Sequence, residues 1–218
     1  LHGMLGYAQL LSRNPHLTDS QRKGLDIIQR SGDHLLTLLN DILDLSKIEA
    51  GKLEFRPTAF NFTRALKSLV EMVRFRAEQK GLDFEYQKDD DLPYIVHGDE
   101  KCLRQVLLNL LGNAIKFTEQ GRVTFRVTAQ GARQKTQGAG QEAESLNAFR
   151  FSVEDTGIGI PADQLEVIFS PFEQVKDQSA QASRRVRFEG TGLGLAISRR
   201  LVRMMGSELH VHSTVHAG

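Results

Sequence analysis

The apolar residues between positions 19 and 50 repeat with the period of a helix, and one helical hairpin cannot bury them all. Those closest to a heptad grid are Leu25, Ile28, Leu35, Leu39, Ile42 and Leu45 or Ser46. Gly32 interrupts the grid where a leucine would be expected. The stripe is widened by Leu36, Leu38, Leu43 and Ile48. This stripe is too wide for a two-stranded seam, so we expect two hairpins to pack as a four-helix bundle in a homodimer.

A first, shorter helix is predicted from Leu1 to about Arg13, where apolar residues also recur at helical spacing. Pro15 then disfavours helix at Asn14, and either Thr18 or Asp19 is a suitable cap for the long helix. That helix is expected to run to about Ala50, because Gly51 follows it. The first 51 residues therefore predict a helical hairpin.

The pattern after Gly51 changes to alternating strands and helices. Strands are expected in "LEFRPTAF", an edge strand because of Pro57, and in "LDFEYQ", "YIVHGD", "RVTFRVTAQ" and "AFRFSVED". Helices are expected in residues 62–81, 99–117 and 195–206. Two polar stretches without periodicity, 131–147 and 173–190, are interpreted as mobile excursions. This order predicts an α/β sandwich.

Composition excludes several classes of partner. A net charge of +1 provides no basic surface for nucleic acid, and no apolar run approaches the ~20 residues that a membrane helix needs. One cysteine, Cys102, excludes a disulfide within this sequence and any zinc site built on several cysteines, and it fits a reducing compartment.

Four short motifs follow one another in the second part of the chain: "LLNLLGNAIKF", "EDTGIGIP", "FSPFEQ" and "GTGLGL". Each is weak alone, since a G-x-G doublet is usually only a turn that needs a positive φ. Together they resemble the ATP-binding domain shared by gyrase, the heat-shock chaperone, mismatch-repair ATPases and histidine kinases. The resemblance to sensor histidine kinases is closest, because "NDILDLSKIEAGKLEF" is similar to the end of their dimerisation hairpin.

Asn109, Asn113 and Lys116 share one face of the predicted helix. An amide oxygen suits Mg²⁺, and a lysine suits phosphate. The resemblance implies that Asn113 binds the metal, that Lys116 contacts phosphate, and that Asn109 and Lys116 are catalytic residues that also bind the nucleotide. Without the other motifs, both asparagines are better explained as helix-surface residues, and Lys116 is equally well explained as a solvated charge.

Asp155 ends an alternating strand and is followed by Gly157 and Gly159, which allow the backbone to pass close to a flat ligand. The resemblance implies that Asp155 accepts a hydrogen bond from the adenine amino group, whereas a strand-end aspartate is more often a cap or turn former.

The last motif precedes an apolar helix, whose free N–H groups and dipole favour phosphates. It comprises the nucleotide-binding candidates Gly190, Thr191, Gly192, Leu193 and Gly194. Glu189 stands where the family usually has another glycine, which leaves the hinge of the lid less defined. Phe169, Pro171 and Phe172 are interpreted either as core aromatics at the base of a loop or as a hinge under that lid.

None of the seven histidines lies in the acceptor motif of the family, which has the form H-E-x-x-x-P-L. Leu1 aligns with the last leucine of that motif, so we expect the acceptor to precede Leu1 and His2 to be an ordinary helix residue. We likewise expect the family's last strand to follow Gly218.

These observations predict an α+β chain with a truncated dimerisation and phosphotransfer hairpin in residues 1–51 and a truncated ATP-binding domain in residues 52–218, in which helices cover one face of a mixed sheet. The resemblance implies a cytoplasmic, ATP-dependent protein histidine kinase that uses ATP and Mg²⁺ and passes phosphate to a response-regulator aspartate. The expected partners are a second copy and a receiver domain, with no nucleic acid or membrane contact. A hybrid kinase, a degenerate nucleotide-binding or dimerisation module and another ATPase of the same superfamily stay open.

Overall fold

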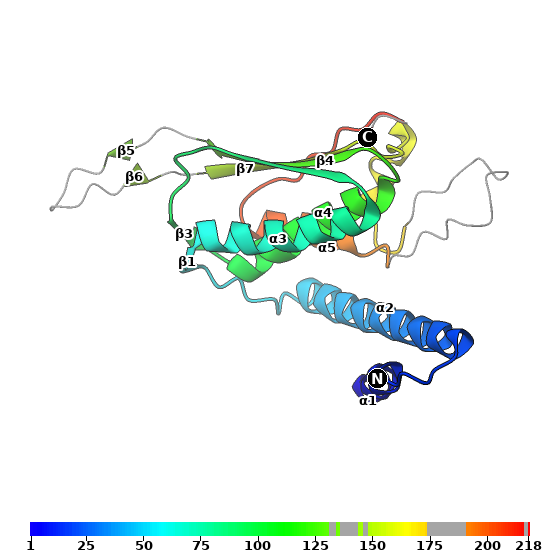
Figure 1. The fold of residues 1–218 in the computed structure, drawn as a ribbon. Coiled ribbons are helices and arrows are strands. Elements are labelled where there is room, and N and C mark those ends of the chain that lie inside the picture. The colour runs from blue at the N-terminus through cyan, green and yellow to red at the C-terminus, as the bar shows by residue number, and fades with distance from the viewer. Residues whose placement is uncertain (131–133, 136–143, 146–147, 174–190, 216–217) are drawn as a thin grey trace. The chain divides into compact units, whose positions relative to one another are not determined.

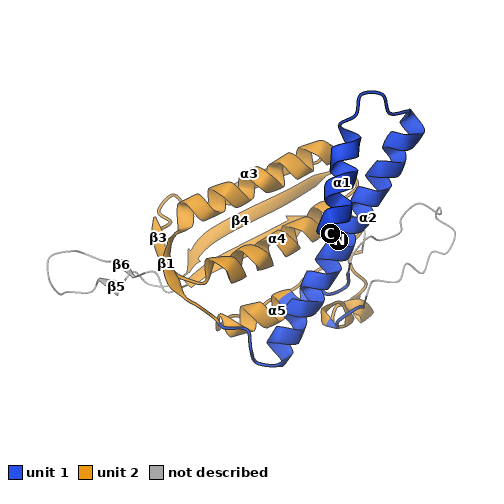
Figure 2. Cartoon of the chain, turned by 90° about the horizontal axis from the view of Figure 1, so that it is seen from below, with its two compact units in different colours: residues 1–54, 170–197 blue, residues 55–169, 198–218 orange. Residues whose placement is uncertain are grey.

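The computed structural model describes residues 1–130, 134–135, 144–145, 148–173, 191–215 and 218. The chain forms two compact units (Figure 2). Residues 1–54 and 170–197 make up one of them, which we call the hairpin unit. The other, the sheet unit, consists of residues 55–169 and 198–218.

The hairpin unit contains helix α1, His2–Ser12, and the long helix α2, Asp19–Glu49 (Figure 1). Thr18 caps α2 with a reciprocal pair of hydrogen bonds: its side chain accepts from the backbone N–H of Gln21, and its own N–H donates to Gln21 Oε1 at 2.9 Å. Of the two predicted caps, Thr18 is therefore the one used.

Gly32 has a packing role that the heptad pattern could not reveal. A Cβ atom built at Gly32 would lie 2.5 Å from Cδ2 of Leu5, so the leucine of α1 occupies the space next to this glycine. The interruption in the grid therefore marks the contact of α1 with α2.

Part of the predicted apolar stripe of α2 is exposed, although Ile48 at its end is buried. Leu35 and Leu39 are each 50% exposed, and the side chains of Ile28, Ile42 and Leu43 are exposed to a similar extent. Side chains of this kind are normally removed from water in a stable assembly.

The sheet unit contains a mixed sheet, as expected from the resemblance. Its strands are β2 (Asp83–Lys88), β4 (Arg122–Gln130) and β7 (Ala148–Asp155), in the order β2-β4-β7. The pair β2 and β4 is parallel, and β4 and β7 are antiparallel. Two short antiparallel pairs are β1 (Thr58–Asn61) with β3 (Ile95–Gly98), and β5 (Gln134–Lys135) with β6 (Glu144–Ser145).

The expected strand "LEFRPTAF" begins only at Thr58, so its first half is a correction to the sequence prediction. Proline lacks an N–H for a ladder hydrogen bond, and Pro57 therefore marks where pairing starts instead of sitting inside the strand.

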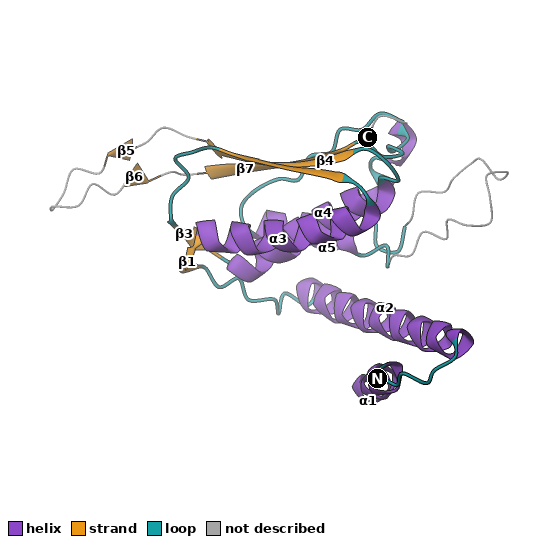
Figure 3. Cartoon of the chain, viewed as in Figure 1, coloured by secondary structure: helices purple, strands orange, loops and turns teal. Residues whose placement is uncertain are grey.

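Helices α3 (Phe62–Lys80) and α4 (Glu100–Phe117) cover one face of this sheet (Figures 1 and 3). Asn61 and Asp99 cap their N-termini, and Gly81, at φ 74°, ends α3 as predicted. The core between the layers is apolar and includes the fully buried Leu69, Val73, Leu111, Val123, Phe125 and Val127. The remaining helices are the short η1 (Ala162–Gln164) and η2 (Val167–Phe169), and α5 (Gly194–Met204).

The two stretches predicted as mobile excursions lie outside the described residues, apart from β5, β6 and Glu173. Within the part of the chain that the structure describes, every helix is too short or too polar to cross a membrane.

Candidate nucleotide-binding site

Asp155 lies at the end of β7, where the structure fixes one of its two carboxylate oxygens. Oδ1 accepts a hydrogen bond from the backbone N–H of Gly157 at 2.8 Å and lies 3.4 Å from Oγ1 of Thr118. Among the described residues, no protein donor is found for Oδ2 of Asp155. A carboxylate held in this way can accept a further hydrogen bond from a ligand through Oδ2.

Thr118 follows the last residue of α4 and lies next to Asp155, although the sequence did not indicate it as a site residue. It is fully buried, and its Oγ1 donates to the carbonyl of Ala114 at 2.8 Å while its N–H bonds the same carbonyl at 3.1 Å. The available signal was a hydroxyl residue directly after an apolar helix, which is too common to be diagnostic.

The glycines after Asp155 are required by the protein's own packing. A Cβ at Gly157 would lie 2.6 Å from Oδ1 of Asp155 and 2.6 Å from the carbonyl oxygen of Phe117. Gly159 has a φ of 69°, and a Cβ there would overlap the carbonyl of Thr214. The close approach to a flat ligand that the sequence suggested stays a prediction.

Helix α4 carries Asn109, Asn113 and Lys116, as predicted. Nδ2 of Asn109 donates to Oγ of Ser198 on α5 at 3.0 Å, and Ser198 is almost completely buried. The Asn113 side chain is half-buried, and no hydrogen bond from it to another described residue is found. Nζ of Lys116 lies 4.5 Å from the ring centroid of Phe117. Asn109 therefore has a packing role in addition to its predicted one.

The C-terminal turn of α4 is held from the side of α3 by Lys80. Nζ of Lys80 donates to the carbonyl of Ile115 at 2.6 Å and to the carbonyl of Lys116 at 2.7 Å. Burial lowers the pKa of Lys80 below its ordinary 10.5, and the carboxylate of Glu119 opposes this shift.

Thr191 belongs to the hairpin unit, where it contacts α2. Its Oγ1 donates to Oδ2 of Asp41 at 2.9 Å and accepts from the N–H of Leu193 at 3.1 Å. Burial raises the pKa of Asp41 above its usual 3.8, the hydrogen bond from Thr191 opposes the rise, and the charge of Asp44 adds to it. The sequence did not indicate Asp41, because nothing in its local pattern points to a residue so distant in the chain.

Gly192 and Phe172 form a tight backbone pair in the hairpin unit. Gly192 has a φ of 70°, and its carbonyl accepts the N–H of Phe172 at 3.1 Å. Phe172 itself has a φ of 66°, unusual for a residue with a side chain, and is 61% exposed. The interpretation of Phe172 as a core aromatic is therefore wrong. The backbone hydrogen bond from Phe172 to Gly192 links the chain before position 174 to the chain after position 190.

Of the remaining candidates in the last motif, Leu193 is fully buried and Gly194 is the first residue of α5. Gly190 lies outside the described residues. Asn113, Lys116, Asp155 and the two glycines after it thus belong to the sheet unit, and Thr191 to Gly194 belong to the hairpin unit.

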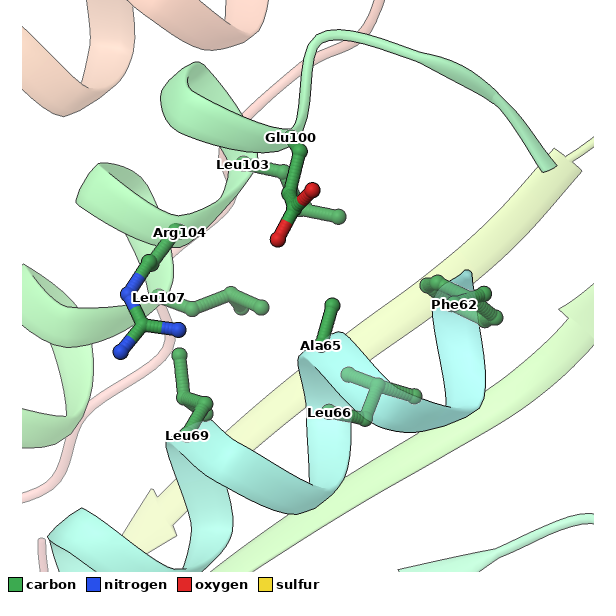
Figure 4. A pocket seen from close by; sticks show the side chains of 8 residues that line it. All are labelled: Phe62, Ala65, Leu66, Leu69, Glu100, Leu103, Arg104 and Leu107. Carbon is green, nitrogen blue, oxygen red and sulfur yellow. The ribbon is translucent and has the colours of Figure 1, made fainter. Parts of the chain in front are cut away.

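A separate pocket lies between α3 and α4, and one of its lining residues, Leu107, is the first residue of the motif on α4. Figure 4 shows Leu66 and Leu69 of α3 facing Leu103 and Arg104 of α4. It contains none of the candidate nucleotide-binding residues. Among the described residues there is also no cluster of three or more His, Cys, Asp or Glu side chains that would suit a metal.

Two protein-family models match the chain. The one described as "Histidine kinase-, DNA gyrase B-, and HSP90-like ATPase" matches residues 98–218. The one described as "His Kinase A (phospho-acceptor) domain" matches residues 1–51.

Curated relatives match along the whole chain. "Hybrid signal transduction histidine kinase B" of Dictyostelium discoideum is 37% identical over 218 residues, which is 100% of this chain and 10% of that protein. "Autoinducer 2 sensor kinase/phosphatase LuxQ" of Vibrio vulnificus strain YJ016 is 39% identical over 219 residues, 100% of this chain and 24% of that protein. The chain thus spans a quarter or less of the length of these two relatives.

Solved structures share the fold. Full-length ShkA in complex with AMPPNP has a TM-score of 0.68 and 35% identity, covering 94% of this chain and 38% of that chain. The Acinetobacter baumannii histidine kinase AdeS, with a TM-score of 0.56 and 20% identity over 93% of this chain and 83% of that chain, shows the likeness of fold alone.

Proposed function

Because the chain belongs to the histidine kinase family, we propose that it binds Mg-ATP and serves transfer of the γ-phosphoryl group to a histidine, for relay to a response-regulator aspartate. Residues 1–51 would form the dimerisation and phosphotransfer hairpin, and residues 52–218 the ATP-binding catalytic domain. The availability of ATP and the receiver domain would place this reaction in the cytoplasm.

The observation that carries the proposal is the geometry of Asp155. Its Oδ1 is held by Gly157, and Oδ2 has no donor among the described residues, so a ligand could donate to Oδ2 without displacing a described donor. The exocyclic amino group of adenine is a donor that this oxygen would accept. A preorganised acceptor of this kind discriminates against bases that lack the amino group, because a missing partner leaves a polar group unpaired.

Within the sheet unit, the phosphate end would be bound by α4. Asn113 has an amide oxygen with no described protein partner, and a single amide ligand fits Mg²⁺, which usually binds through one or two protein groups together with phosphate oxygens and water. Bound with ATP, Mg²⁺ would neutralise charge on the phosphates. Lys116 would add positive charge at the transferred group, and Asn109 would hold α4 in place through Ser198.

The uncovered stripe of α2 supports a homodimer. Leu35 and Leu39 are half exposed in the single chain, and a second copy of the same hairpin would cover them in a four-helix bundle. A receiver domain is proposed as the second partner on the strength of family membership and of the hybrid relatives.

Calorimetric titration of ATP against Asp155→Asn tests the proposal. The amide can keep the bond from Gly157 but carries no charge, so ATP affinity should fall roughly tenfold with an unchanged far-ultraviolet circular dichroism spectrum. Glu154→Gln is the matched control, because Glu154 is the exposed neighbour that pairs with Arg126 at 3.4 Å. Equal affinities for D155N, E154Q and the wild type would remove Asp155 from the site, and no binding by the wild type would contradict the proposed function itself.

A further inference from the structure

The last four carbonyl groups of α4, those of residues 114–117, all accept hydrogen bonds, and the last three accept them from groups outside the regular helix ladder. An α-helix leaves four C-terminal carbonyls without partners of its own. Thr118 bonds the first of them, that of Ala114. The last, that of Phe117, accepts the N–H of Ile158 at 3.4 Å. Ile158 belongs to the segment that follows Asp155, so the last carbonyl of the turn is bonded to that segment.

The two middle carbonyls of this turn depend on one side chain. They belong to Ile115 and Lys116, and both accept from Nζ of Lys80, the last residue of α3. A cation at a helix C-terminus is favoured by the helix dipole as well as by these hydrogen bonds. Lys80 therefore fixes the last turn of α4 from the side of α3.

We propose that Lys80 is a positioning residue for the phosphate end of the nucleotide, holding the turn of α4 that presents Asn113 and Lys116 relative to Asp155. The inference rests on the proposed function. One of the two carbonyls belongs to Lys116 itself, and the other lies two residues after Asn113. Adenine recognition should depend less on Lys80, because the N–H of Gly157, which lies outside α4, holds Oδ1 of Asp155.

This separation makes the proposal testable with two ligands. Adenosine reports on the adenine contact alone, and Mg-ADP reports on adenine and phosphates together. The quantity to compare is the dissociation constant of adenosine divided by that of Mg-ADP. Lys80→Met keeps the aliphatic stem and removes the donor, so Mg-ADP should bind more weakly and this ratio should fall roughly fivefold, the factor that corresponds to one net hydrogen bond. Adenosine binding should stay at the wild-type value.

Two further variants separate positioning from mere stability. Lys80→Arg keeps a cation with donors for both carbonyls and should restore the ratio. Lys67→Met is the matched control, because Lys67 lies on the same helix and only pairs with Glu71 at 3.9 Å on an exposed face. Its ratio should equal that of the wild type. If K80M does not fold, K80Q, which retains one amide donor group, replaces it in the same comparison.

The outcomes distinguish a failure of the role of Lys80 from a failure of the proposed function. Suppose that the wild type binds both ligands. An unchanged ratio in K80M, whether from unaltered affinities or from equal losses for adenosine and Mg-ADP, would then overturn the role of Lys80 and leave the proposed function intact. A fall in the ratio in K80M that is absent from both K80R and K67M supports the inference. Absence of Mg-ADP binding by the wild type would overturn the proposed function and the inference with it.

Discussion

Replacing glycine by alanine should have opposite effects at positions 157 and 112. A Cβ at Gly157 would lie 2.6 Å from Oδ1 of Asp155 and from the carbonyl of Phe117, whereas ordinary contacts begin near 3.4 Å, so each must gain 3.4 − 2.6 = 0.8 Å. Neither can move freely, since the first accepts from Gly157 and the second from Ile158. Overpacking of this kind costs about 1–3 kcal/mol.

At Gly112 the same added methyl group meets nothing within 4 Å. Gly112 lies inside α4, where alanine is favoured over glycine by roughly 0.5–1 kcal/mol because less backbone entropy is lost on folding. Gly112→Ala should therefore stabilise the protein slightly, while Gly157→Ala destabilises it and weakens ATP binding by displacing Asp155.

Urea unfolding followed by circular dichroism, with calorimetric titration of ATP, measures both effects. The free energies of unfolding of the two variants should lie on opposite sides of the wild-type value. If G157A matched the wild type in both stability and ATP affinity, the tight packing between Asp155 and the end of α4 would be refuted, and with it the reason given for a glycine at this position.

Three other perturbations test separate parts of the structure. Leu39→Asp should shift the mass measured by light scattering toward the monomer, because a charge would replace a half-exposed leucine in the proposed bundle; a monomeric wild type at high concentration would count against that bundle. Burial raises the pKa of Asp99, but hydrogen bonds, first from the N–H groups of Arg56 and Cys102, lower it by more, so the folded pKa lies below the unfolded value of about 3.8. Asp99 should therefore contribute stability that is fully present above the unfolded pKa and is lost as pH falls through the folded pKa. Asp99→Ala should therefore cost roughly 1–2 kcal/mol at pH 7 and flatten the acid decline of the unfolding free energy, and an unaltered pH profile would contradict this account. Incubation with radiolabelled ATP and peptide mapping should find no acid-labile phosphate on any of the seven histidines, since none has the acceptor motif; stoichiometric label on His2 would show that motif to be misplaced.

The sequence alone determined the elements and the class of site. Thr18 and Gly81 act as predicted because helix caps depend on a few neighbouring residues, and the mixed sheet and the covering helices follow the motifs that carry the resemblance. The uncovered stripe of α2 was equally readable, since helical periodicity is a local property.

Tertiary structure alone decided how these elements are fastened to one another. Leu5 explains Gly32, and Thr118 and Lys80 hold the end of α4, yet no local pattern distinguishes these residues from others of their type. Their partners lie far away in the chain or in the backbone, and a carbonyl group carries no sequence identity. Such contacts exist only once packing has brought the elements together, and this is why the candidate residues could be predicted from the sequence, while the contacts that hold them in place required the fold.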